Sequence, residues 1–206
     1  MNKYAIWASV FVIPLLYELC RRVAAEHYVM VALGLHWLLT AAVLIWTKKT
    51  LAGPKDIGLP NLLKGFACFA CCIALYCAAL NWVFGSMRLG DWQWSLPGMT
   101  TFKRSGIVAM ALSAGFCEEV IYRGYMMTAL KKAGQPIWVA MVASSLSFVF
   151  FHGMLPTPML VAGFVIAMIW AAIVQRTSLL WATVYIHAFW DASVALIPWH
   201  ALFIGE

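Results

Sequence analysis

Long apolar runs, separated by short polar or Pro/Gly-marked breaks, repeat along the whole chain. Each run is close to the roughly 17 to 25 helical residues that cross a hydrocarbon core of about 30 Å. Unbroken runs of this length favour helices, because a backbone in lipid must satisfy its own hydrogen bonds and barrel strands show shorter, alternating segments. The pattern predicts seven spans, at 4–20, 28–47, 65–85, 106–130, 136–152, 158–175 and 178–197.

The segment 86–104 (SMRLGDWQWSLPGMTTFKR) interrupts this pattern, because it is too polar and too rich in turn residues to span a membrane. Its Trp92 and Trp94 predict an anchor at the headgroup level or a short surface helix, since indole rings favour that depth.

The composition agrees with a membrane protein, because 64% of the residues are hydrophobic and only 11% are charged, whereas soluble domains carry about 25% charged residues. We therefore predict an all-α, polytopic membrane helix bundle that forms one integrated domain. Residues 1–104 supply the N-terminal helices and the interfacial segment, and residues 105–206 supply a second group of helices.

The positive charges are divided unevenly between the two sides of the predicted bundle. By the positive-inside rule, this division places the N-terminus in the cytoplasm, and we expect a prokaryotic inner (plasma) membrane. The net charge of +6 is accounted for by these loops and gives no reason to invoke nucleic acid. The N-terminal side carries Lys3, Lys48, Lys49, Lys55, Lys64, Lys131, Lys132 and Arg176, and the opposite side carries Arg21, Arg22, Arg88, Lys103 and Arg104.

Two adjacent glutamates and an arginine lie inside the fourth span, in the stretch GFCEEVIYRG. An ionisable side chain at mid-bilayer costs about 2.5 to 3.5 kcal/mol on insertion scales, which makes it a functional hypothesis by default. Glu119 and Arg123 are spaced i, i+4 with the acid first, the favourable order for an ion pair. This pair would leave Glu118 free, although a purely structural pair between helices is an alternative.

Two histidines lie inside the following spans, each with a partner one helical turn away. Phe148 precedes His152, and His187 precedes Asp191, so that each pair shares a helix face. A core histidine or a helix-packing hydrogen bond would explain either pair alone. Together with Glu118 the set fits hydrolysis of an acyl bond by water, with a carboxylate as base and imidazoles as donors. No Gly-x-Ser-x-Gly nucleophile elbow competes with this interpretation.

The order Glu-Glu-x-x-x-Arg, Phe-x-x-x-His and His-x-x-x-Asp resembles the CAAX protease and bacteriocin-processing family (CPBP, or Abi) of intramembrane proteases. The resemblance covers about residues 105–197. It implies about eight helices around a conical, water-accessible cavity, with peptidase activity near the membrane interface. Since seven spans are counted here, the resemblance implies a short or re-entrant eighth span within 86–104. It also implies roles for single residues: Glu118 activates the water, His152 helps to hold it, Glu119 and Arg123 support the site, and His187 and Asp191 occupy the oxyanion-stabilising positions.

Asp191 departs from the family pattern, because many members have Asn at this position and an ionised carboxylate cannot donate a hydrogen bond to an oxyanion. Either Asp191 is protonated or it orients His187, which then acts as the donor. We expect the second arrangement.

The chemistry of the site leaves metal dependence open. Glu118, His152 and His187 are plausible ligands for a divalent metal such as zinc, but no His-Glu-x-x-His motif is present. We favour a glutamate mechanism without a cofactor. The expected partners are membrane lipid and a membrane-anchored, prenylated or leader peptide. A proton-coupled transporter and a non-catalytic membrane scaffold are the alternative functions.

Overall fold

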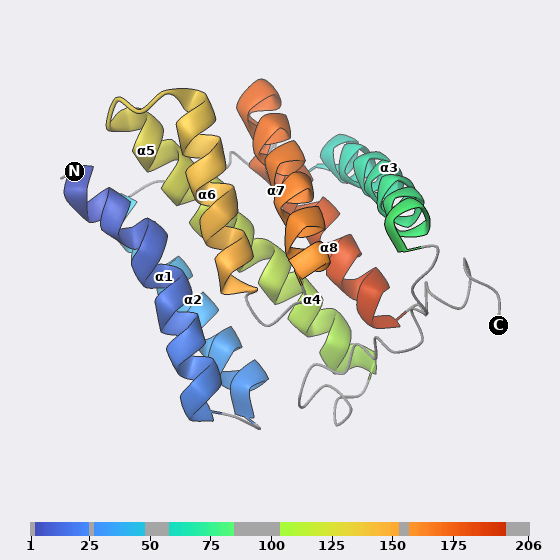
Figure 1. Ribbon diagram of the computed structural model, residues 1–206, viewed down its shortest axis with the longest axis horizontal. Coiled ribbons are helices and arrows are strands. Elements are labelled where there is room, and N and C mark those ends of the chain that lie inside the picture. Colours follow the sequence, from blue (N-terminus) through green and yellow to red (C-terminus); the bar gives the residue numbers. More distant parts are fainter. Residues whose placement is uncertain (1–2, 25–26, 48–57, 85–103, 153–156, 197–206) are drawn as a thin grey trace.

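The computed structural model describes residues 3–24, 27–47, 58–84, 104–152 and 157–196 (Figure 1). Within these ranges the chain forms seven continuous helices and no strand. One of them contains three segments, since α4 continues through the π-helical stretch η5 into α5. The elements are α1 (Lys3–Ala24), α2 (Tyr28–Thr47), α3 (Leu59–Phe84), α4 (Arg104–Glu119), η5 (Val120–Met127), α5 (Thr128–Lys132), α6 (Ile137–Phe151), α7 (Thr157–Thr177) and α8 (Leu180–Leu196).

The predicted all-α class is confirmed for the described residues, and each helix lies close to one of the predicted spans. The largest difference is α3, which begins at Leu59 and not at residue 65. The prediction for Trp92 and Trp94 falls outside the described residues. Two described helices are long and apolar enough to cross a membrane, at Lys3–Ala24 and Leu160–Thr177. The complete polytopic arrangement and its cavity stay predictions.

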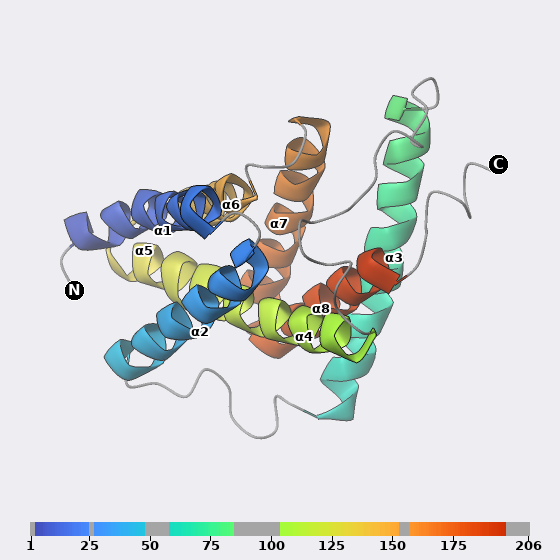
Figure 2. The ribbon, with the colours of Figure 1, turned by 90° about the horizontal axis from the view of Figure 1, so that it is seen from below.

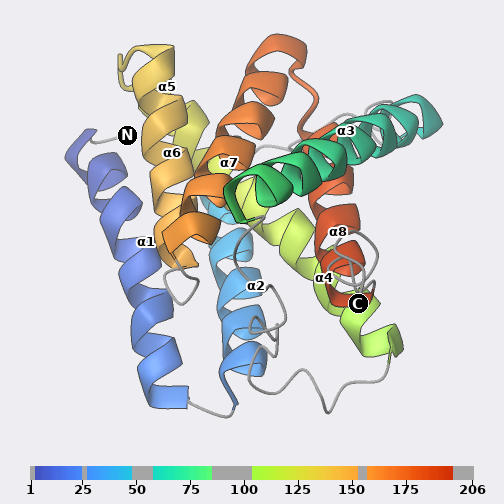
Figure 3. The same ribbon diagram turned by 45° about the vertical axis from the view of Figure 1, so that its right-hand side comes forward.

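The helices are arranged around the long α4–η5–α5 helix. Figure 1 shows α1 and α2 on one flank of the molecule and α3 on the other, with α6 and α7 between them, and Figure 3 shows α3 passing in front of α8. Figure 2, which views the same ribbon from below, shows α4 running beside α8, with α3 crossing the end of this pair. Among the described helices, α4 and α8 pack against each other most extensively. The first part of the fourth apolar run is thereby held against α8.

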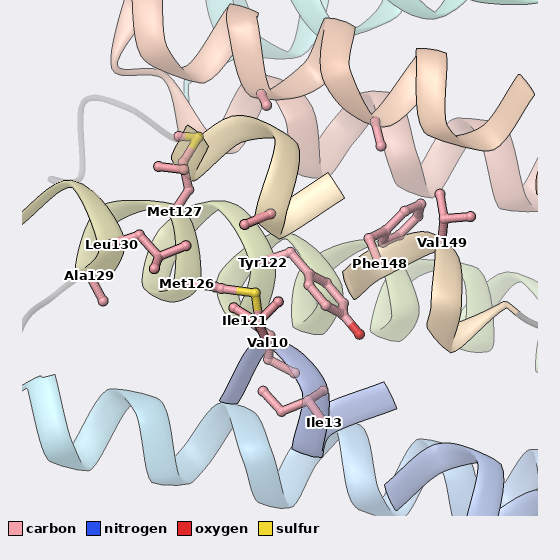
Figure 4. Packing of buried hydrophobic residues seen from close by; sticks show 14 of the residues in the cluster. Val10, Ile13, Ile121, Tyr122, Met126, Met127, Ala129, Leu130, Phe148 and Val149 are labelled. Carbon is pink, nitrogen blue, oxygen red and sulfur yellow. The ribbon is translucent and has the colours of Figure 1, made fainter. Parts of the chain in front are cut away.

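A compact cluster of buried apolar side chains joins α1, η5 and α6 (Figure 4). The inward residues of α1 recur every three or four positions, which is the spacing of one helix face. Close interdigitation of this kind fixes neighbouring helices at a defined separation, because interiors pack as densely as organic crystals. The labelled members of the cluster include Val10 and Ile13 of α1, Ile121, Tyr122 and Met126 of η5, and Phe148 and Val149 of α6.

A buried serine completes the hydrogen bonds of α1 around its proline. Pro14 lies inside the helix and has no N–H, so it cannot donate to the carbonyl of Val10 four residues earlier. The hydroxyl of Ser147 on α6 donates to that carbonyl oxygen at 2.7 Å. A backbone carbonyl that the sequence would leave without an intrahelical donor thus becomes a link between two helices.

The close approach of α4 and α8 depends on a glycine. A Cβ atom at Gly115 would lie 2.7 Å from the backbone nitrogen and 3.0 Å from the Cα of Ala188. Gly65 has the same function between α3 and α8, since its Cβ would lie 2.8 Å from the Cβ of Tyr185. Gly115 is one turn before the two glutamates and Ala188 directly follows His187, so this contact sets the distance between the site's two principal helices.

Candidate active site

Glu118 and Glu119 end α4 and are almost completely buried, with 3% and 0% of their surface exposed. The helix then widens into the π-helical stretch η5. Such π-turns inside α-helices occur frequently at functional sites. The Thr128 hydroxyl donates to the carbonyl of Arg123, five residues earlier, at 3.3 Å. Because adjacent side chains of a helix point in different directions, the two glutamates have different neighbours.

Glu119 connects the arginine of its own helix to the histidine of α8. Its Oε1 lies 3.1 Å from Arg123 Nη1 and 3.1 Å from His187 Nδ1. The predicted i, i+4 pair of Glu119 and Arg123 is confirmed, and the contact with His187 is a further link across 68 positions of sequence. Glu119 therefore holds the histidine ring by a charge-assisted hydrogen bond, a strong class of contact in a buried site.

Arg123 is fully buried and is held on several sides. Its Nη2 donates to the carbonyl oxygen of Ala167 on α7 at 3.3 Å. Its guanidinium carbon lies 4.7 Å from the ring centroid of Phe148 and 5.7 Å from that of Trp170. Aromatic faces attract a cation through their quadrupole, and the attraction is strongest where water is excluded. Phe148, a predicted site residue, thus contributes to the burial of the arginine.

Glu118 lies between two imidazole rings that come from different helices. Its Oε1 is 3.2 Å from His36 Nε2, and its Oε2 is 3.5 Å from His187 Nε2. Glu118 Oε2 is buried and accepts no hydrogen bond from any described protein group. Oε2, the oxygen that faces His187, is therefore available to accept a hydrogen bond from a small polar molecule.

His36 lies outside the three sequence motifs and was not predicted as a site residue; it lies on α2, with 3% of its surface exposed. A signal for it exists in the sequence, because His36 is an ionisable residue in the middle of the apolar run 28–47. Thr40 follows one turn later on the same buried face of α2. The three motifs all lie in the second half of the chain, whereas His36 lies in the first half.

Both ring nitrogens of His187 face carboxylate oxygens. Nδ1 contacts Glu119, whereas Nε2 lies 3.5 Å from Glu118 Oε2 and 3.6 Å from Asp191 Oδ2. A doubly protonated ring suits this arrangement, because both nitrogens are then donors. His187 Nδ1–H donates to Glu119 the hydrogen bond that fixes the ring, and Asp191 stands slightly beyond hydrogen-bond length with 31% of its side chain exposed. Asp191 thus marks the more open edge of the cluster.

His152 directly follows α6 and stands beside this cluster. Its Nδ1 bonds to the carbonyl oxygen of Phe148 at 2.9 Å. Since a carbonyl only accepts, Nδ1 carries the proton and a neutral ring has Nε2 as its acceptor. The ring packs against Phe148 at 4.7 Å and Phe151 at 4.4 Å between centroids. The rings that lie within ion-pair distance of Glu118 in the described structure are those of His36 and His187.

The donor groups do not form a ligand set for a metal ion. Across the described ranges no group of three or more His, Cys, Asp or Glu side chains is placed to hold one. The mechanism without a cofactor and the divalent metal that the motifs left open both stay predictions.

One family model matches this chain. Residues 101–193 match the family described as Rce1-like, type II CAAX prenyl endopeptidase Rce1-like. No curated protein and no solved structure gives a significant match. The matched region extends over the residues from Glu118 to Asp191 and excludes His36. It confirms, for this part of the chain, the family resemblance that the three motifs indicated.

Proposed function

We propose that this chain, which carries a domain of the Rce1-like CAAX protease family at residues 101–193, hydrolyses a peptide bond of a membrane-associated substrate with water activated by Glu118. The observation that carries the proposal is the position of Glu118. One of its oxygens faces His36, and the other faces His187 without a hydrogen bond from a described protein group. A carboxylate held in this way has one oxygen free to accept a proton from water.

The proposed reaction begins when Glu118 Oε2 takes a proton from water and the water oxygen attacks the scissile carbonyl carbon. The carbonyl oxygen becomes negatively charged, and His187 Nε2–H donates a hydrogen bond to it. Glu118 then gives its proton to the leaving nitrogen as the carbon–nitrogen bond breaks. The products are a carboxylic acid and an amine, and Glu118 returns to its ionised form.

The other residues of the site prepare this step. Glu119 Oε1 lies 3.1 Å from Arg123 Nη1 and 3.1 Å from His187 Nδ1. Arg123 therefore fixes Glu119, and Glu119 in turn fixes the His187 ring. His152 is fixed with Nδ1–H on its own helix, so Nε2 can accept a hydrogen bond from the attacking water. Fixed groups of this kind cost little reorganisation as charge develops in the transition state.

The proposed mechanism uses no metal, because Glu118 itself serves as the base that takes the proton from water. The family description makes a prenylated C-terminal peptide the first substrate to test. Bacteriocin-type leader peptides and C-terminal anchor segments are the alternatives that the motifs left open. In each case the substrate reaches the site from the lipid, so that membrane lipid is an expected partner.

The experiment compares Glu118→Gln with the wild-type protein in nanodiscs. The probe is a quenched fluorescent peptide that ends in a farnesylated cysteine and three further residues, and a peptide without the farnesyl group is the substrate control. Glu118→Gln preserves the shape of the side chain and removes the base, so we expect kcat to fall about 10²- to 10⁴-fold.

The matched control is Glu18→Gln, because Glu18 pairs with Arg21 and Arg22 on the exposed side of α1, away from the site. It should cleave at the wild-type rate, and a chelator should leave the wild-type rate unchanged. The proposal is refuted if Glu118→Gln cleaves as fast as the wild type, or if the wild type cleaves neither this probe nor leader and anchor peptides.

A further inference from the structure

A histidine outside the matched family region completes the surroundings of Glu118. His36 comes from α2, and its Nε2 lies 3.2 Å from Glu118 Oε1. The nitrogen is not aligned for a linear hydrogen bond, since neither ring nitrogen of His36 has one to a described group. Burying an imidazole without a partner costs free energy, and the carboxylate of Glu118 is the charged group that faces it.

Rings from two other helices hold the His36 side chain. Its ring centroid lies 4.9 Å from that of Tyr17 on α1 and 5.2 Å from that of Phe151 on α6. Tyr17 and Phe151 also contact each other, at 4.2 Å. The imidazole therefore packs against two aromatic rings, with its Nε2 3.2 Å from Glu118 Oε1. Phe151 also packs against His152, so the same ring borders both histidines.

We propose that His36 is a positioning residue, which holds Glu118 Oε1 by the electrostatic attraction of its Nε2–H group at 3.2 Å and thereby presents Oε2 to the attacking water. This inference rests on the proposed function. A carboxylate has two chemically equivalent oxygens, and a donor on one of them decides which oxygen meets the substrate and in which orientation. His187 faces Oε2 from the opposite side at 3.5 Å, so the two histidines distinguish the two oxygens of the base.

The role of α2 in the site follows from this contact. The family match covers residues 101–193 only, and α2 would otherwise serve as packing for α1 and α4. With His36 in place, the N-terminal helices contribute a group that touches the proposed base. A misplacement of a reacting group by about 1 Å can cost about 10²-fold in rate. Loss of the His36 contact should therefore lower kcat and leave substrate binding unchanged.

The test uses two substitutions that separate the donor from the ring. His36→Phe keeps an aromatic ring against Tyr17 and Phe151 but removes the N–H group. His36→Gln keeps an N–H donor at similar reach but removes the ring. Each is measured in nanodiscs with the farnesylated peptide, beside the wild type, Glu118→Gln and Thr40→Val, which changes a neighbouring buried position of the same α2 face.

We expect His36→Phe to lower kcat about 10- to 100-fold with KM unchanged, and His36→Gln and Thr40→Val to stay within a few-fold of the wild type. Size-exclusion profiles and thermal unfolding establish that each variant folds. If His36→Phe does not fold, His36→Leu replaces it as the variant without a donor. If neither apolar variant folds while His36→Gln does, the residue is structural and the inference is overturned.

The outcomes distinguish the two proposals. Full activity of His36→Phe together with an inactive Glu118→Gln overturns the positioning role alone. A loss in His36→Gln as large as in His36→Phe also overturns it, because the donor would then not be the feature that matters. Full activity of Glu118→Gln, or a wild type that cleaves no peptide, overturns the proposed function and this inference with it.

Discussion

Replacement of Gly115 by alanine tests whether the α4–α8 contact sets the geometry of the site. The new Cβ would lie 2.7 Å from Ala188 N, 3.0 Å from its Cα and 3.1 Å from its Cβ. Ordinary contacts of a Cβ begin at about 3.4 Å, and backbone atoms cannot turn aside as a flexible side chain can. The two helices must therefore separate by roughly half an ångström or more, the shortfall in these distances.

Overpacking of this kind costs about 1 to 3 kcal/mol. A glycine-to-alanine change inside a helix also raises the free energy of unfolding by about 0.5 to 1 kcal/mol. The control variant must therefore be a glycine-to-alanine change in a helix as well. Gly34→Ala on α2 is suitable, because its Cβ would meet no atom within 4 Å. We expect Gly115→Ala to be less stable than Gly34→Ala by about 1 to 3 kcal/mol.

The second effect of Gly115→Ala is on the site itself. The hydrogen bond between Glu119 Oε1 and His187 Nδ1 is 3.1 Å long and joins the same two helices. Separation of the helices lengthens it, so we expect peptide cleavage to fall by about 10-fold or more. Thermal unfolding and initial cleavage rates in nanodiscs measure both effects. A Gly115→Ala protein as stable and as active as Gly34→Ala would refute the close approach of α4 and α8.

Two further predictions concern a helix link and the edge of the site. Ser147→Ala should cost about 1 to 3 kcal/mol, because it leaves the buried carbonyl of Val10 without a donor. In a Pro14→Ala background, whose new N–H supplies that donor, the cost should nearly vanish; an equal cost in both backgrounds in a double-mutant cycle would contradict this account. Asp191→Asn should keep the cleavage rate within a few-fold of the wild type, since Asp191 Oδ2 is 3.6 Å from His187 Nε2, beyond hydrogen-bond length. A 100-fold loss would instead favour the predicted role of the carboxylate in orienting the His187 ring.

The helices and two local pairs were predictable from the sequence. Long apolar runs predicted the positions of the described helices, because each run has few arrangements that satisfy its own backbone. The pairs Glu119–Arg123 and His187–Asp191 follow from the i, i+4 spacing of a helix. Such contacts depend on the geometry of a single element, which the sequence alone determines.

Contacts between helices were decided only by the tertiary structure. The sequence does not show that Glu119 meets His187, that Ser147 reaches Val10, or that His36 faces Glu118. Each of these depends on the rotation and separation of two helices, which small residues such as Gly115 fix through packing of the whole bundle. Helical periodicity tells which residues share a face, but it carries no information on which other face will be packed against it.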